Sequence, residues 1–200
     1  MNAIARSGAQ RPPGHRVPAW ALALPVLVVL AATAAGVAMV IADRSSNAVW
    51  VAAGHARMGE AAPNFTSSDL RGKRVSLSDF GSRPVLLTFW ATWCTVCKDE
   101  LPALQTLEQR YSSDGVKVLA VNYRETNNER MRQYLAGINV TLQSAIDPGG
   151  AIATAYGVDV GLPVNVLVDR TGRVAQIMIG EVPIASIETA LKQLVARTGG

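Results

Sequence analysis

The chain has 200 residues, of which 49% are hydrophobic and 17% are charged, and its formal net charge is +4. This length and apolar content suffice for one domain with a sizeable core and an appendage. Three of the four net charges come from Arg6, Arg11 and Arg16, so the rest of the chain is close to neutral. The positive charge therefore does not indicate nucleic-acid binding, and we expect no nucleic-acid partner.

Residues 19–42 carry no charge, and at about 1.5 Å per residue a helix of that length crosses a hydrocarbon core of about 30 Å. The preceding residues 1–18 are basic and lack acidic residues, which places them in the cytoplasm and the remainder outside it. The sequence predicts a cytoplasmic tail and one transmembrane anchor. A cleaved signal peptide is the alternative, because residues 32–34 offer a small-residue cleavage pattern, although the apolar run continues to residue 41.

Residues 43–58 are small, polar and aperiodic, which predicts a linker before a globular domain over residues 59–200. That domain opens with a turn at residues 70–73 and a short alternating strand at residues 75–77. Residues 85–90, VLLTFW, form a nearly continuous run of strand formers, which is typical of a strand buried on both faces.

Leu101, Leu104, Leu107 and Tyr111 then recur at helical spacing, and the helix should end at residues 112–115. The remaining predicted elements are strands at 116–122, 142–146, 164–168 and 174–179, and helices at 129–137, 150–156 and 184–195. The turn at residues 169–172 predicts an antiparallel final strand pair. We expect an α/β fold with a mixed central sheet and helices on both faces.

Cys94 and Cys97 are the only cysteines. A zinc site needs about four ligands, whereas this chain offers two cysteines and two histidines, one of them His15 in the predicted tail. We therefore expect no metal and no cofactor. A structural disulfide is the plain alternative, but a bond that closes so short a loop restricts the unfolded chain very little.

The cysteines fall where a buried strand ends and a helix begins. Cys94 should lie at the helix N-terminus, where backbone N–H groups and the macrodipole favour a thiolate. Cys97, one turn further along, can attack a mixed disulfide formed at Cys94. The spacing predicts a dithiol that exchanges with other thiols and disulfides.

The segment FWATWCTVCKDELPAL resembles the active-site segment of membrane-anchored thioredoxin-like proteins of the TlpA/ResA type. Further matches follow in the same order along the chain: APNFTSSDLRGKRVSLSDF, VLAVNYRET, DPGGAIATAYGV and GLPVNVLVDRTGRV. The resemblance implies a thioredoxin-like fold with an inserted helix and strand at about residues 127–146. It also implies an enzyme that reduces disulfides of exported proteins.

The same resemblance implies a setting for the reaction. In the ResA branch the substrate is apocytochrome c during cytochrome c maturation, and a membrane protein supplies the electrons. The catalytic domain would then lie in the periplasm or another extracytoplasmic space, tethered to the bacterial cytoplasmic membrane. Two alternatives remain open, namely an oxidant or isomerase of exported thiols and a copper-handling module for oxidase assembly.

Residue by residue, the resemblance makes Cys94 the exposed nucleophile and Cys97 the buried resolving thiol. Pro163 would follow a cis peptide bond and leave the preceding backbone free to hold a substrate strand. Trp93 would pack beside the disulfide.

The chain also departs from thioredoxin itself, which has a buried aspartate where this chain has Thr88. That carboxylate cannot serve Cys97 here. Water or Glu125, which aligns with an acidic residue near the active site of ResA-like proteins, would then have to act as the proton relay.

Overall fold

The computed structural model describes residues 49–51, 54–159 and 161–196, all within one compact unit over residues 45–200. The predicted tail, residues 1–18, and the predicted anchor, residues 19–42, lie outside the described residues. Within the part that is described, no helix is both long enough and apolar enough to cross a membrane.

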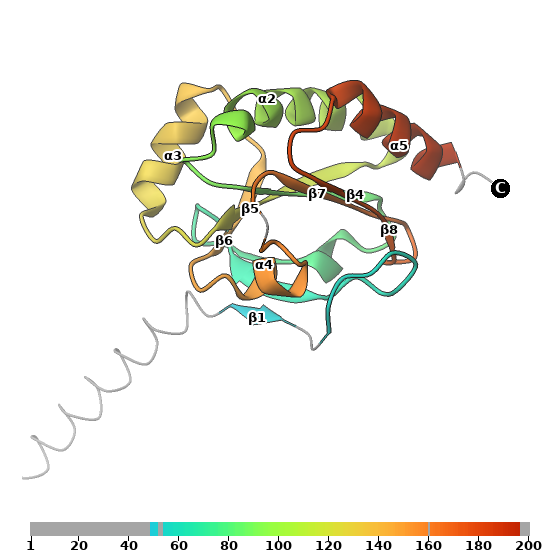
Figure 1. The fold of residues 1–200 in the computed structure, drawn as a ribbon, viewed down its shortest axis with the longest axis horizontal. Helices are drawn as coiled ribbons and strands as arrows, with labels where there is room; N and C mark the ends of the chain where they lie inside the picture. Colours follow the sequence, from blue (N-terminus) through green and yellow to red (C-terminus); the bar gives the residue numbers. More distant parts are fainter. Residues whose placement is uncertain (1–48, 52–53, 160, 197–200) are drawn as a thin grey trace, which may run out of the picture. The chain divides into compact units, whose positions relative to one another are not determined.

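A five-stranded mixed sheet forms the centre of the unit, with its strands in the order β6-β5-β4-β7-β8 (Figure 1). The neighbours β4, β5 and β6 run parallel, whereas β7 is antiparallel to both β4 and β8. The strands are β4 Val85–Trp90, β5 Lys117–Tyr123, β6 Gln143–Asp147, β7 Val164–Val168 and β8 Val174–Ile179. The predicted mixed sheet and the predicted antiparallel final pair are confirmed.

Alternate side chains of the central strand enter two separate cores. Leu86 and Trp90 of β4 pack against one set of helices, and Leu87 and Phe89 pack on the opposite face. The helices on the first face are α2 Thr95–Arg110, α3 Asn128–Gly137 and α5 Ile184–Ala196, while the short α4 Ala151–Ala155 covers the second (Figure 1). The helix and strand predicted as an insertion correspond to α3 and β6.

A three-stranded antiparallel sheet adds to the second face, in the order β1-β2-β3. Its strands are β1 Trp50–Val51, β2 Phe65–Ser68 and β3 Arg74–Ser76. The range 43–58 is thus not a linker throughout, because β1 pairs with β2. The sequence did not reveal β2, whose serines look polar; Ser67 is nevertheless buried, and its hydroxyl donates to the carbonyl of Ile146.

The strand predicted at residues 75–77 is also wrong at its end. β3 stops at Ser76, and Leu77–Phe80 form the 3-10 helix η1. Asp79 causes the change, because its carboxylate accepts the backbone N–H of Ser76 at 2.8 Å and so caps the new helix. A second 3-10 turn, η2 Ser112–Asp114, follows α2 where the sequence predicted the helix to end.

Candidate active site

Both cysteines lie at the junction between β4 and α2. Cys94 is the N-cap of α2, and its sulfur accepts the backbone N–H of Cys97 at 3.2 Å. The two residues form a disulfide with a Cα–Cα distance of 5.3 Å. The predicted helix N-terminal position of Cys94 is confirmed. The first turn of α2 has no acidic residue, so its backbone N–H groups and dipole act on Cys94 without a competing negative charge.

The two sulfurs differ less in exposure than the resemblance implied. Cys97 is 1% exposed, in agreement with a buried resolving thiol, but Cys94 is only 6% exposed. Cys94 is therefore the more accessible partner without being an exposed residue. A substrate must approach the sulfur of Cys94 through the surface next to it.

The peptide bond between Leu162 and Pro163 is cis, as predicted, and Pro163 lies next to the end of β4 that leads to the cysteines. Its place follows from the sheet register, because Phe89 of β4 pairs with Val164 of β7. The residue before Val164 is therefore opposite the end of β4, from which the chain enters the cysteine segment. The carbonyl of Pro163 accepts the N–H of Gly180 at 2.8 Å, which fixes this loop to the end of β8.

Trp93 is not a core aromatic residue. Its side chain is 59% exposed, and its ring meets the edge of the Tyr123 ring at a centroid distance of 6.3 Å. It directly precedes Cys94 in the chain, so it forms part of the surface around that sulfur.

Glu125 lies close to the cysteine segment. Its carboxylate accepts the backbone N–H of Thr92 at 2.8 Å, the hydroxyl of Thr92 at 2.5 Å and the side-chain amide of Asn122 at 2.7 Å. These contacts join the segment before Cys94 to the end of β5. They support a positioning role for Glu125, while its role as a proton relay stays a prediction.

A second carboxylate, which the sequence did not single out, lies deeper in the site. Glu100 of α2 is 6% exposed, and its carboxylate accepts the side-chain amide of Asn165 at 2.5 Å. Residues three apart share one face of a helix, so Glu100 lies one turn beyond Cys97 on the same face. Burial raises the pKa of Glu100; the hydrogen bond from Asn165 opposes the rise, and the charge of Glu181 adds to it.

Thr88, which stands where thioredoxin has a buried aspartate, is the strand partner of Asn165. The strand position of Thr88 has no carboxylate in this chain. A buried carboxylate comes instead from Glu100 of α2, which is hydrogen-bonded to the strand partner of Thr88. The sequence offered one signal, since Glu100 belongs to the segment FWATWCTVCKDELPAL that carries the resemblance. The contact of Glu100 with Asn165 spans 65 positions, however, and only the fold reveals it.

The copper-handling alternative gains no ligand from the methionines. Thioether sulfurs are typical Cu(I) ligands, but Met131 and Met178 are both buried in the core cluster under α2, α3 and α5. No group of three or more histidine, cysteine, aspartate or glutamate side chains that could hold a metal occurs among the residues that the structure describes.

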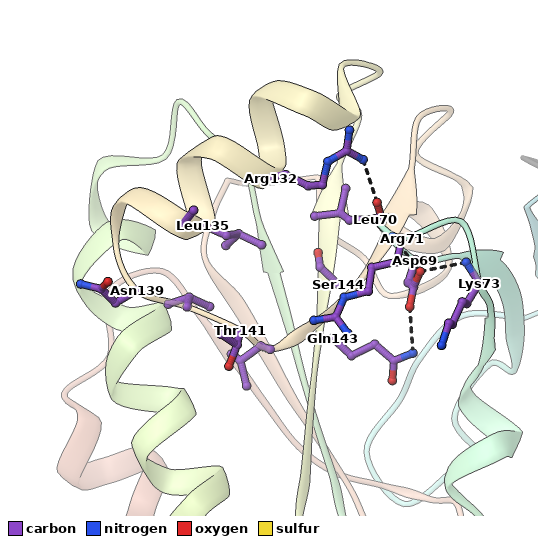
Figure 2. A pocket seen from close by; sticks show the side chains of 13 residues that line it. Asp69, Leu70, Arg71, Lys73, Arg132, Leu135, Asn139, Thr141, Gln143 and Ser144 are labelled. Carbon is purple, nitrogen blue, oxygen red and sulfur yellow. Dashed lines mark hydrogen bonds between the residues drawn. The ribbon is translucent and has the colours of Figure 1, made fainter.

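A cavity of about 670 Å³ opens between the β2–β3 turn, α3 and the start of β6 (Figure 2). Arg132 donates to the carbonyl of Leu70 at 2.9 Å, and Gln143 donates to Asp69 at 3.4 Å across this space. Since β4 and β6 point the same way and Cys94 follows the end of β4, the start of β6 is at the far end of the sheet. This cavity is therefore separate from the cysteine site.

Comparison with known proteins agrees with the geometry. The AhpC/TSA family pattern matches residues 58–177. The chain belongs to this family. It is 36% identical over 137 residues to the thiol-disulfide oxidoreductase ResA of Bacillus thuringiensis subsp. konkukian, which covers 68% of this chain and 78% of that protein. ResA of Bacillus subtilis is 33% identical, over 67% of this chain and 74% of its own length.

A solved structure supports the same assignment. The putative thiol:disulfide interchange protein DsbE from Chlorobium tepidum superposes with a TM-score of 0.64 and 31% identity, covering 72% of this chain and 99% of that one. The chain thus has a thioredoxin-like fold. With its Cys-x-x-Cys pair at the N-terminus of α2, it is a thiol-disulfide oxidoreductase of the ResA and DsbE type.

Proposed function

We propose that this protein reduces disulfide bonds of exported proteins, that apocytochrome c is among its substrates, and that residues 19–42 tether it to the bacterial cytoplasmic membrane. The observation that carries the proposal is the Cys94–Cys97 pair at the N-terminus of a 16-residue helix, with Pro163 in a cis peptide next to the end of β4 that leads to it. The helix favours a thiolate at Cys94, and we propose that the backbone before Pro163 holds the substrate strand.

The reaction proceeds by two exchanges in the reduced enzyme. The Cys94 thiolate attacks one sulfur of the substrate disulfide, so that the substrate S–S bond breaks, a Cys94–substrate disulfide forms and one substrate thiolate leaves. The Cys97 thiolate then attacks the sulfur of Cys94 and releases the second substrate thiolate. Two electrons have passed to the substrate, and the enzyme carries the Cys94–Cys97 disulfide.

Cys97 must lose a proton before it attacks, yet it is almost fully buried. Glu100 lies on the same helix face and is held by Asn165. Because burial raises its pKa, Glu100 is a better proton acceptor than an exposed glutamate. We assign Glu100 the transfer of this proton, while Glu125 positions the segment that carries Cys94.

Recharging requires a membrane dithiol that reduces the Cys94–Cys97 disulfide by the reverse exchange. A tether beside such a donor raises the effective concentration of the two partners without any new contact. Residues 1–18 would then face the cytoplasm and residues 59–200 the periplasm or extracytoplasmic space.

The first test is the reduction potential of Cys94/Cys97 in the full-length protein, measured in detergent against glutathione and dithiothreitol buffers. We expect a value near or below about −220 mV, in the range of reductants. A value near about −120 mV would instead identify an oxidant of exported thiols.

The substrate and location need separate tests. We expect rapid reduction of an oxidised peptide with the Cys-x-x-Cys-His haem-attachment pattern, and labelling of reduced Cys94 in intact cells by a membrane-impermeant maleimide. Failure to reduce the peptide would remove apocytochrome c as substrate. Labelling only after cell lysis would contradict the extracytoplasmic location.

A further inference from the structure

Exposed Trp93, half-buried Tyr123 and exposed Arg124 contact one another in series, and this group is called here the Trp93–Arg124 surface. Trp93 meets the edge of the Tyr123 ring, and the guanidinium carbon of Arg124 lies 5.0 Å from the centroid of the same ring. The three side chains form a continuous series of contacts that begins at the residue before Cys94. A cation and two aromatic rings thus extend from the residue that precedes Cys94.

Arg124 occupies this place at a conformational cost. Its φ is +56°, in the left-handed region that residues with a Cβ seldom adopt. The backbone is held there because the N–H of Arg124 donates to the carbonyl of Asp147 at 3.1 Å. A strained residue beside a reactive group is a common feature of functional sites.

Gly150 fixes the other side of the arginine. A Cβ at Gly150 would lie only 2.3 Å from Nε of Arg124, and Gly150 itself is buried with a φ of +73°. The guanidinium therefore rests in a slot between the Tyr123 ring and the Gly150 backbone. Few rotamers remain open to it, so little further ordering is needed when it binds a partner.

The guanidinium of Arg124 has no direct polar partner among the described residues, although its charge acts on the buried carboxylate of Asp147 and opposes the rise that burial causes in the pKa of that group. Its guanidinium forms no hydrogen bond or ion pair with any residue in the described part of the chain, and the residue is exposed. Neither nearby carboxylate is hydrogen-bonded to the guanidinium: Asp147 is buried and its Oδ2 accepts the N–H of Ala153, while Glu125 accepts hydrogen bonds from Thr92 and Asn122. A preformed cation consequently faces solvent.

We propose that the Trp93–Arg124 surface binds the substrate polypeptide beside its reactive cysteine, and that Arg124 selects substrates with a carboxylate side chain next to that cysteine. The inference rests on the proposed reductase function and names its specificity. The rings provide apolar contact area, and the guanidinium provides charge-assisted hydrogen bonds to a carboxylate. Pro163 would hold the substrate backbone while Arg124 distinguishes its side chains.

The test compares two disulfide-bonded peptides that differ only in Glu or Gln beside one cysteine. The readout is the ratio of their kcat/KM values with the full-length enzyme in detergent. For one partly exposed ion pair we expect the wild type to prefer the Glu peptide by about three- to tenfold, less at high salt. Arg124→Gly should bring the ratio close to one, while Arg124→Lys should retain part of the preference.

Arg124→Gly also suits the left-handed backbone, so we expect its unfolding midpoint to be no lower than that of the wild type. The matched control is Arg130→Gln, which removes an equally exposed arginine on α3 and should keep the wild-type ratio. No preference in the wild type, or an unchanged ratio in Arg124→Gly, overturns this inference alone. Failure of the wild type to reduce either peptide overturns the proposed reductase function.

Discussion

The two ends of helix α2 carry carboxylate contacts of opposite character. At its N-terminal end Glu100 is buried and receives one side-chain hydrogen bond, from Asn165. At its C-terminal end Arg110 and Tyr111 donate to Glu188 of α5 at 2.9 Å and 2.8 Å, and Lys192 approaches the same oxygen at 3.2 Å. One carboxylate has a single polar partner in the core, while the other has three near the surface.

The pKa values of Glu100 and Glu188 shift in opposite directions, because the two carboxylates differ in burial and in hydrogen-bond donors. Burial is the main cause of the raised pKa of Glu100, whereas the hydrogen bond from Tyr111, followed by those from Arg110 and Lys192, lowers the pKa of Glu188 to about 2. Asn165 also keeps its carbonyl oxygen buried without a partner among the described residues. An unpaired buried polar atom reduces stability. At the redox end of α2 burial favours the protonated form of Glu100, as the proposed proton transfer requires, whereas at the other end three hydrogen-bond donors favour the ionised form of Glu188 and attach α5.

The largest loss of activity should come from replacing the resolving thiol, Cys97, at the N-terminal end of α2. In Cys97→Ser the first exchange still occurs, but no thiolate remains to release Cys94. Turnover should fall by at least about 10³-fold, the scale observed when an enzyme loses an essential nucleophile. The substrate should be trapped as a mixed disulfide at Cys94, detectable on non-reducing gels and by mass spectrometry.

Cys94→Ser is the matched control, since it removes the other sulfur of the same pair. It should abolish turnover without any trapped substrate. Trapping at Cys97 in Cys94→Ser, with none at Cys94 in Cys97→Ser, would reverse the assigned roles of the two cysteines.

Much of the fold could be predicted from the sequence because its central strands are buried on both faces. The strands predicted at residues 85–90, 164–168 and 174–179 have the bounds found in the structure. The first two, β4 and β7, are buried along their whole length, and such strands appear as runs of apolar residues whatever they pack against. The third, β8, is a partly exposed edge strand, which its apolar residues and the turn before it made recognisable. β2 could not be found in this way, because Ser67 is buried through a hydrogen bond to the distant carbonyl of Ile146 rather than through apolar contact.

The candidate site shows the same limit. Cys94 and Cys97 were predictable because their chemistry depends on a local spacing at one helix end. The Glu100–Asn165 contact depends on β7 pairing with β4 below α2, and no local pattern encodes that distance in the chain. The shielding of Cys94 was also missed, since burial of one sulfur depends on loops from several parts of the fold.

An intermediate effect is expected from removing the charge of Glu100. In Glu100→Gln the resolving step should slow by at least about tenfold at neutral pH, because Cys97 loses its proton acceptor. Its pH profile should also lose the inflection that the carboxylate contributes. Stopped-flow measurement of resolution from a preformed mixed disulfide gives both quantities.

Asp99→Asn controls for charge on the same helix, because Asp99 is adjacent and exposed, and it should leave the profile unchanged. Glu125→Gln tests the rival carboxylate. If the pH profile of the resolving step shifted in Glu125→Gln but not in Glu100→Gln, Glu125 rather than Glu100 would be the proton relay.

Unfolding as a function of pH provides an independent check on Glu100. A carboxyl group with a raised pKa in the folded state favours folding at pH values below its unfolded pKa, and this advantage is lost as the pH rises through the folded pKa. Glu100→Gln cannot ionise, so its stability relative to the wild type should increase over that interval. A constant difference across the interval would contradict a buried, proton-holding Glu100.

The smallest effect belongs to the attachment end. Glu188→Gln should lower the Tm at pH 7 by at most about 3 °C, because ion pairs near the surface are screened by solvent. The pKa of Glu188 is depressed, so its contribution is complete above the ordinary glutamate pKa of 4.5 and is lost as the pH falls towards 2. The Tm difference between Glu188→Gln and the wild type should therefore shrink with acidification.

Glu60→Gln is the control, since Glu60 is exposed and its ion-pair partner, Arg57, is 4.0 Å away. If the two variants behaved alike from pH 7 to pH 2, the contacts of Glu188 would not stabilise α5 on α2, and the contrast between the two ends of the helix would fail.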